Sequence, residues 1–439
     1  MGSRIVAKPP DEEKRRWSPA TRLAFRFCVI YLGLFCLATQ ISGSMLPNLA
    51  FAYRGLGRLA PMRDVTHLVA QSVFGITVPL DDLSDGEPLF FWVQTFWIAV
   101  VSVLAVAVWT AFDRRRPHDG TLYGWFYLFV RVALAASLFE YGMTKLIPTQ
   151  FPAPPLTTLV TPVGELTLSA LLWTSIGAAQ PYEIFTGCIE VLAGVLVLIP
   201  RTTILGATLG LAALTQVLAL NMAYDIGLKL VTLHLIVLAA FLLAPDVPRF
   251  IDFFVRHRPS EASTPPLPVR TPRAQRVALF APIVLGAYAL GMYAYINWTF
   301  WHVAGDKRPK SALYGIWNVR QLSVDGEARP PELNDYDRRW RRVIFDAPGT
   351  IVFQRTDDSL APYGASIDTS RAAITLTRVN SRNRAAAFTY ERPAEDRLTI
   401  AGDMDGHHIE ADLRRVGFDE FPVLNSSFRW IRPHEKRRP

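Results

Sequence analysis

The chain has 439 residues, of which 50% are hydrophobic and 19% are charged, and its formal net charge is +8. This apolar fraction is too large for a fully soluble protein, and the charged fraction is too large for a chain embedded in a membrane throughout. The charges must therefore be segregated along the sequence. No basic domain is left free to wrap a duplex, which argues against nucleic-acid binding.

Seven apolar stretches are long enough to cross a membrane, which requires about 20 consecutive apolar residues. The predicted spans are residues 24–41, 88–112, 123–147, 181–200, 203–222, 228–245 and 277–298. The apolar stretch 166–176 has only 11 residues and follows several prolines. We interpret it as an interfacial or re-entrant segment, because it is too short to cross.

Composition divides the chain into six segments around these spans. We expect the linker among them, which is rich in proline, serine and arginine, to be a disordered loop. The segments are a cytoplasmic tail (1–22), two spans with an outer loop (23–122), a four-span bundle (123–246), the linker (247–276), a last span (277–298) and an exported domain (299–439).

Basic residues follow one side of the predicted membrane. They occur in the N-terminal tail, in the loop 113–116, at Arg201 and in segment 249–276. Lys and Arg in short loops mark the cytoplasmic side, and seven alternating spans place all four regions there. We therefore expect a multi-pass protein of a bacterial cytoplasmic membrane, surrounded by lipid, with a cytoplasmic N-terminus and a periplasmic C-terminal domain.

The third predicted span carries cations on one face and a carboxylate on the other. Arg131, Gly142 and Lys145 occur at i, i+11 and i+14, which at about 3.6 residues per turn is one helix face. Glu140 is turned about 180° away from Arg131. Ionisable residues at membrane depth are costly and usually face a partner or a functional site.

The fourth predicted span presents two carboxylates and two glycines on one face, which are Glu183, Gly187, Glu190 and Gly194. The glycines permit close approach of another helix. In an antiparallel pair of helices we expect Lys145 to meet Glu183 near the outer interface. Glu190 then lies about 10 Å deeper, toward Arg131.

These polar residues allow two interpretations. A carboxylate with a histidine nearby can relay protons to a reduced carrier such as a quinone. The alternative is a set of paired charges that fixes helix register without chemistry. The candidate catalytic residues are Glu140, Glu190 and His234, and the candidate ligand-binding residues are Arg131, Lys145, Glu183 and Glu190.

The sequence offers little support for a metal or haem cofactor. His234 is the only histidine within a predicted span, whereas a haem usually takes two axial ligands. His407 and His408 are adjacent, so on a strand they point to opposite faces and cannot share an ion. No paired cysteines, nucleotide-binding loop or nucleophile elbow is present.

Residues 123–246 resemble the DoxX family of four-span membrane proteins. The resemblance rests on the early Arg131, on Gly142 and Lys145 at the outer end of the same helix, and on Glu190 followed by Gly194. It implies a four-helix core and a quinone-associated function, since relatives are linked to thiosulfate:quinone oxidoreductase and terminal-oxidase subunits. A redox partner protein would then supply the electrons.

The C-terminal domain is predicted to be all-β. Runs such as 373–379, 397–401 and 408–413 alternate apolar and polar residues and are separated by turns. About eight short antiparallel strands between Leu313 and Ile431 would close a small barrel. A sandwich or another meander is the alternative.

The beginning of this domain is similar to the G-x-W start of lipocalins and related calycins. Here the motif comprises Gly315 and Trp317. The resemblance implies that Trp317 plugs one end of the barrel and that an arginine from the end of the domain, Arg429 or Arg432, packs over it.

Two functions of different classes remain from the sequence. One is a quinone-linked oxidoreductase subunit that uses the intramembrane Arg, Glu and Lys residues. The other is a non-catalytic scaffold or a protein that binds or transfers an apolar ligand such as a lipid, with the barrel as its binding module. The sequence leaves open whether the protein is an enzyme.

Overall fold

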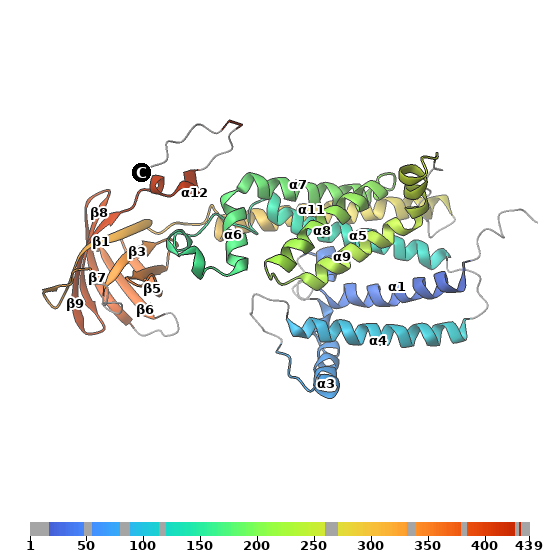
Figure 1. Cartoon of the computed structure of the whole chain (residues 1–439), viewed down its shortest axis with the longest axis horizontal. Coiled ribbons are helices and arrows are strands. Elements are labelled where there is room, and N and C mark those ends of the chain that lie inside the picture. Colours follow the sequence, from blue (N-terminus) through green and yellow to red (C-terminus); the bar gives the residue numbers. More distant parts are fainter. Residues whose placement is uncertain are drawn as a thin grey trace, which may run out of the picture. The chain divides into compact units, whose positions relative to one another are not determined.

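The computed structural model describes residues 17–47, 55–79, 88–113, 120–259, 271–331, 339–378, 384–425 and 430–431. The chain forms two compact units (Figure 1). The helical unit comprises residues within 1–150 and 181–299, and the barrel unit comprises residues within 151–180 and 300–439. The predicted fold class, a helical membrane bundle with a C-terminal all-β domain, is confirmed.

Within the described residues, seven helices are long and apolar enough to cross a membrane, as the sequence predicted. The protein is therefore a multi-pass membrane protein. The helices are α1 (Pro19–Ala38), α4 (Leu89–Phe112), α5 (Gly120–Leu146), α7 (Gln180–Leu198), α8 (Thr203–Ala223), the helical run Lys229–Val255 that begins with α9 (Lys229–Leu243), and α11 (Pro272–Val303).

Helix α5 is the central element of the helical unit. About 72% of the residues in its most apolar stretch are buried. In the other six spans the corresponding share is 28% to 50%. Its inner residues join a core cluster with α1, α7, α8, α9 and α11, in which Leu134, Leu138 and Phe139 are almost inaccessible. Because α5 is enclosed on several sides, each polar group on it must find a partner inside the bundle.

Glycines bring α7 within backbone contact of α5. A Cβ atom at Gly187 would lie 2.5 Å from the backbone nitrogen of Leu146 and 2.7 Å from the carbonyl oxygen of Gly142. At Gly142 it would lie 2.9 Å from the backbone nitrogen of Val191. Only a residue without a side chain permits this approach, as expected from the glycine pattern.

The outer loop between α1 and α4 contains the short helices α2 (Ile41–Met45), η3 (Leu56–Arg58) and α3 (Met62–Phe74). Buried Gln94 of α4 donates a hydrogen bond of 2.9 Å to the carbonyl of Gly57. Trp97 of α4 donates a hydrogen bond of 3.0 Å to Thr66 on α3.

Helix α3 runs across the direction of α1 and α4 (Figure 1) and exposes Leu68 and Phe74. This arrangement is typical of a helix lying in a membrane interface.

After α9 the chain continues through η6 (Ala244–Asp246), α10 (Val247–Phe250) and a π-helical turn, η7 (Ile251–Val255). Residues 260–270 of the predicted disordered linker (247–276) lie outside the described residues.

The barrel unit contains one antiparallel sheet that closes on itself. β1 pairs with β2 and with β3, and from β3 onward each strand pairs with the next. β1 also pairs with β9, from Trp317 opposite Arg415 to Val324 opposite Ile409. Because β2 is only a two-residue strand beside β1, the result is the predicted eight-stranded closed barrel rather than a sandwich. The strands are β1 (Gly315–Val324), β2 (Glu327–Ala328), β3 (Trp340–Phe345), β4 (Thr350–Arg355), β5 (Leu360–Asp368), β6 (Ala373–Arg378), β7 (Arg384–Ala394), β8 (Arg397–Met404) and β9 (His407–Arg415). After β9 come η8 (Phe418–Glu420) and α12 (Pro422–Asn425).

The segment between α5 and α7 belongs to the barrel unit. It contains η4 (Thr158–Val160), η5 (Val163–Glu165) and α6 (Leu168–Ala178). Leu156 packs with Ile316 and Ile344 on the outer side of the barrel wall, and its backbone nitrogen donates to Asp346 at 3.0 Å. The sequence placed this segment in the four-span bundle, whereas its contacts group it with the strands.

The close approach of α5 and α7 gives a direct test of helix packing. Gly187→Ala forces a methyl group into the backbone of α5, and we expect a loss of about 1–3 kcal/mol in the free energy of unfolding. Thermal unfolding of the purified chain in detergent measures it. Gly33→Ala in α1 is the matched control, because no heavy atom lies within 4 Å of the added Cβ. Equal stability of the two variants would contradict this packing.

Candidate functional site

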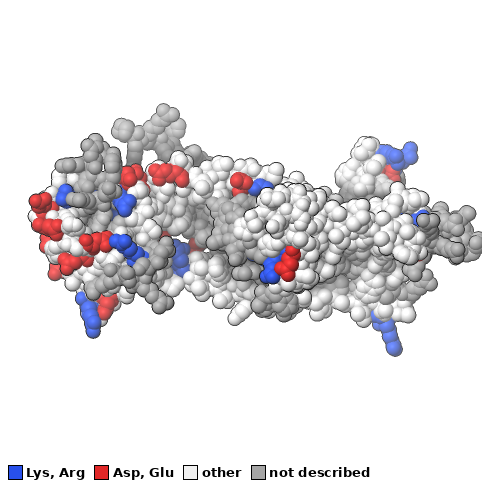
Figure 2. Space-filling view, turned by 90° about the horizontal axis from the view of Figure 1, so that it is seen from below, with Lys and Arg blue, Asp and Glu red and all other residues white. Residues whose placement is uncertain are grey.

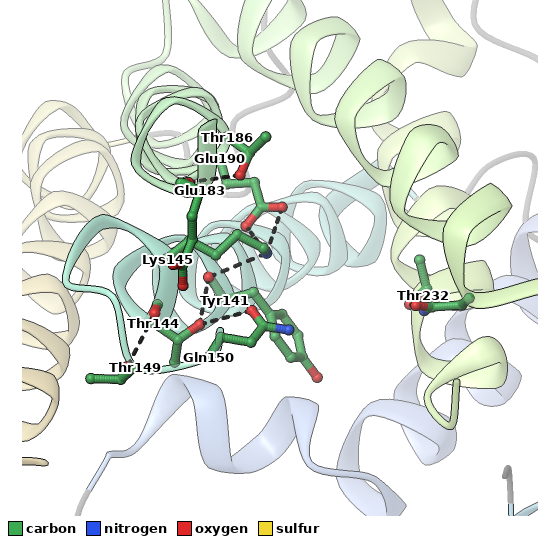
Figure 3. Close-up of polar contacts among 10 residues, drawn as sticks. Tyr141, Thr144, Lys145, Thr149, Gln150, Glu183, Thr186, Glu190 and Thr232 are labelled. Atoms are coloured by element: carbon green, nitrogen blue, oxygen red, sulfur yellow. Dashed lines mark hydrogen bonds and ion pairs between the residues drawn. The ribbon is translucent and has the colours of Figure 1, made fainter. Parts of the chain in front are cut away.

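A buried ion pair joins α5 to α7 (Figure 3). The ammonium nitrogen Nζ of Lys145 lies 2.9 Å and 2.7 Å from the two carboxylate oxygens of Glu190. The two side chains are only 8% and 4% exposed. Nζ also donates to the carbonyl of Tyr141 at 3.4 Å. Two opposite charges are thus neutralised inside the bundle, where either one alone would be costly.

The predicted partners of these charges were wrong. Lys145 pairs with Glu190 rather than Glu183, and Glu190 does not pair with Arg131. The reason is helix geometry, because side chains lean toward the N-terminus of their own helix. The Lys145 side chain therefore runs deeper into the bundle. In an antiparallel neighbour this direction leads to a higher residue number, and so to Glu190.

Arg131 caps the C-terminal end of α7. Its Nε donates to the carbonyl of Val197 at 3.0 Å, and its Nη2 donates to the carbonyl of Leu198. Arg131 is 1% exposed. A cation at this position satisfies carbonyls that have no partner within the helix and offsets the negative end of the helix dipole. Arg131 therefore contributes to helix packing here.

Glu183 and Glu140 lie on different sides of α5. Glu183 is fully buried in the first turn of α7, where the helix dipole favours a carboxylate (Figure 3). Glu140 accepts a hydrogen bond from the Ser44 hydroxyl on α2, and the neighbouring Tyr141 hydroxyl accepts one from Gln40. The two faces of α5 therefore have separate polar contacts, as the spacing of Glu140 and Lys145 predicted.

His234 of α9 is held by residues of α1. Its Nδ1 lies 2.7 Å from the carbonyl of Leu230, and its Nε2 lies 2.8 Å from the Tyr31 hydroxyl. A carbonyl can only accept, so this geometry requires the proton on Nδ1 and leaves Nε2 to accept from Tyr31. The ring is also stacked on Phe35, with centroids 3.5 Å apart. Both ring nitrogens are therefore already engaged.

The hydrogen bonds and ion pairs do not bring the candidate residues into one constellation. Glu190 is bound to Lys145, Glu140 to Ser44, and His234 to Tyr31, each between a different pair of helices. Among the described residues, no group of three or more His, Cys, Asp or Glu side chains could hold a metal ion.

The sequence analysis did not select Arg26, which is 2% exposed inside α1. Its guanidinium forms an ion pair of 3.2 Å with Asp113 at the end of α4 and lies 4.9 Å from the centre of the Trp109 ring. The sequence signal that could have identified Arg26 is its charge within the first predicted span, residues 24–41. The interaction joins α1 to α4.

One end of the barrel is closed by Trp317, which is fully buried. Its indole nitrogen donates to the carbonyl of Leu313 at 3.0 Å. Arg415 lies opposite it on β9, and the Arg392 guanidinium lies 6.0 Å from the ring centre. Gly315 has a φ of +147°, and a Cβ there would lie 2.9 Å from Nε of Arg415. The motif G-x-W therefore leaves space for an arginine over the plug.

The predicted arginines over this plug, Arg429 and Arg432, lie outside the described residues. The structure places Arg415 and Arg392 beside Trp317 instead. Arg415 is the last residue of the last strand, so recognising where β9 ends would have identified it.

The opposite end of the barrel is open and holds a pocket of about 270 Å³. Strand alternation directs apolar side chains into it, and charged residues of the hairpin turns form its rim. The apolar lining residues are Val324, Trp340, Phe353, Ala361, Tyr363, Met404 and Ile409. The charged or titratable ones are Asp325, Arg329, Arg355, Asp405 and His407.

Charged side chains are unevenly distributed between the units. In Figure 2 they gather on the barrel unit, whereas the face of the helical unit in this view carries few. This matches an apolar surface for lipid and a polar surface for water.

Comparison with known proteins identifies one informative relative. The chain is 35% identical over 127 residues to the uncharacterised protein YwoB of Bacillus subtilis (strain 168). The match covers 28% of this chain and 79% of YwoB. The chain belongs to the family of YwoB.

Membership of the YwoB family does not assign an activity to this chain, because YwoB itself is uncharacterised. No family model matches the chain. No solved structure matches it either.

The Lys145–Glu190 pair predicts a strong asymmetry between single and double substitutions. Glu190→Gln leaves Lys145 as an uncompensated buried charge, and we expect a loss of about 3–5 kcal/mol. Lys145→Met combined with Glu190→Gln removes both charges and should recover most of this loss. Thermal unfolding in detergent and accumulation in the membrane measure the effect.

Asp225→Asn breaks the exposed pair with Lys229 and is the control, with an expected loss below about 1 kcal/mol. Additive single effects would contradict the pairing.

His408 provides a pH-dependent contact on the β8–β9 hairpin. Its hydrogen bond to Asp403, at 2.9 Å, raises the pKa of His408 above its usual value. The contact therefore stabilises the fold fully below the unfolded pKa of about 6.5 and is lost as the pH rises through the higher folded pKa. An NMR titration of the full chain with labelled histidine measures this pKa. In Asp403→Asn we expect it to fall toward about 6.5, and an unchanged value would contradict the contact.

Proposed function

We propose that this chain is a membrane-anchored protein that binds small apolar molecules in the mouth of its barrel. The observation that carries the proposal is the pocket formed by Trp340, Phe353, Met404 and their neighbours at the open end. The pocket combines seven apolar side chains with five charged or titratable ones at its edge, and small-molecule sites likewise join apolar surface to polar groups that orient the ligand.

The construction of the barrel supports this proposal. Trp317 closes one end, and the chain both enters at Gly315 and leaves after Arg415 at that same end. The mouth is therefore at the end of the barrel opposite the one at which the chain enters and leaves. Small-molecule sites commonly measure about 300–1,000 Å³, so this pocket suits a small ligand or one end of a larger one.

We further propose the orientation that the basic loops favour, with the N-terminus in the bacterial cytoplasm and the barrel in the periplasm. If all seven candidate spans among the described residues cross the membrane, their odd number would put the two ends of the chain on opposite sides. A periplasmic barrel on a membrane anchor would meet lipid-soluble molecules that leave the outer leaflet, either to bind them or to pass them on.

A quinone-linked oxidoreductase subunit, as the DoxX resemblance implies, is the second candidate. The observation in its favour is the buried Lys145–Glu190 pair, since ionisable groups at membrane depth often belong to functional sites. Electrons would have to come from a partner protein. A scaffold without a ligand is the remaining alternative.

The proposal predicts which substitutions remove a co-purifying molecule. The chain is purified in lipid nanodiscs and extracted with organic solvent, and the extract is identified by mass spectrometry. Ala361→Trp places an indole in the pocket from β5 and should deplete the bound molecule by about tenfold or more, because the indole takes up much of the 270 Å³. Ser366→Trp on the outer face of the same strand is the matched control.

Other results of this experiment separate the alternatives. A quinone lost in Glu190→Gln but retained in Ala361→Trp would favour the oxidoreductase. No enriched molecule in the unsubstituted chain, compared with empty nanodiscs, would contradict both ligand functions and favour a scaffold.

A further inference from the structure

Two cationic side chains at the mouth of the barrel have no acidic partner among the described residues. Arg355 is the next inward position after Phe353 on β4, so its side chain reaches the rim above the apolar floor. Arg329 follows β2 and lines the same pocket. Within the described part of the chain, neither guanidinium lies in an ion pair, and the buried Nε of Arg329 has no hydrogen-bond partner.

The acidic groups at the mouth are already engaged. Asp325 accepts from Nδ1 of His407 at 2.7 Å and from the backbone nitrogen of His408 at 2.9 Å. Asp405 accepts from Arg378 at 3.0 Å. These contacts join the β1–β2 turn to the β8–β9 turn, and β6 to the β8–β9 turn.

Among the described residues, one further carboxylate acts on Arg355, which is that of Asp357 in the exposed β4–β5 turn. Its carboxylate accepts a hydrogen bond of 3.0 Å from the backbone nitrogen of Ser359. It attracts Arg355 through space without forming an ion pair within 4.0 Å. The rim therefore offers two guanidiniums to a ligand and no uncommitted carboxylate among its described lining residues.

We propose that the mouth binds an amphipathic anion, with its apolar part against Trp340 and Phe353 and its carboxylate or phosphate between Arg329 and Arg355. This inference rests on the proposed function and names the class of ligand. Guanidinium groups are suited to carboxylate and phosphate, because their fixed donors match paired oxygens. The half-buried position of both arginines strengthens such contacts relative to water.

The size of the pocket limits the apolar part. A volume of 270 Å³ corresponds to about nine groups of the size of a water molecule. A single chain of about that many carbon atoms fits, whereas a two-chain lipid could insert only the end of one chain. An uncharged chain of the same length would fill the floor but leave the two guanidiniums without a partner.

Equilibrium dialysis of the full chain in nanodiscs, with empty nanodiscs as the background, tests the inference with three labelled probes. Decanoate carries both chain and charge, decanol carries the chain alone, and inorganic phosphate carries charge alone. We expect decanoate to bind at least about tenfold more tightly than decanol, and phosphate to bind more weakly than decanoate.

Arginine substitutions then assign the effect to the rim. Arg329→Gln and Arg355→Gln should each weaken decanoate binding by about tenfold or more and leave decanol binding unchanged. Arg371→Gln, at the opposite end of the barrel, is the matched control. Arg355→Lys keeps the charge and should lose less than Arg355→Gln, whereas a folding defect would reduce the binding of both chain probes.

The possible failures are distinct. If decanoate and decanol bind equally and the arginine variants change neither, the anion selectivity is overturned and the apolar site remains. If neither probe binds above background, and Ala361→Trp is indistinguishable from the unsubstituted chain, the proposed function itself fails. Equally tight binding of phosphate and decanoate would overturn the role of the apolar floor.

Discussion

The packing of α7 against α5 depends on neutralising charge inside the bundle. Lys145 and Glu190 satisfy each other at one level, and Arg131 satisfies the last carbonyls of α7 at another. Along the same interface, glycines such as Gly142 and Gly187 remove the side chains that would hold the helices apart. Because α5 is the most enclosed span, loss of this ion pair would disturb the packing of every helix that contacts α5.

Closure of the sheet has a comparable role in the barrel unit. Pairing of β1 with β9 removes the exposed strand edges and creates an inside and an outside from one alternating pattern. Trp317 fills the end at which the chain enters and leaves. The other end has no such plug, so its inward side chains leave a pocket. The segment around Leu156 covers part of the outer wall, where Ile316 and Ile344 would otherwise be exposed.

The two groups of candidate residues differ in how completely their polar atoms are satisfied. In the helical unit, the ring nitrogens of His234 and the carboxylate of Glu190 have partners from neighbouring helices. At the barrel mouth, Arg329 and Arg355 have no ion pair with the described residues. A fully satisfied network stabilises one structure, whereas unsatisfied charges beside an apolar pocket are available to a ligand.

The sequence by itself determined the seven spans, the all-β character of the C-terminal domain and the polar faces of α5 and α7, because these follow from hydrophobic period and length. Only the tertiary structure decided the partners. The direction in which a lysine side chain leans decided between Glu183 and Glu190, and the closing of β1 on β9 decided which arginine faces Trp317. The rim of the pocket joins residues from distant turns, and such proximity depends on closure of the sheet rather than on any local pattern.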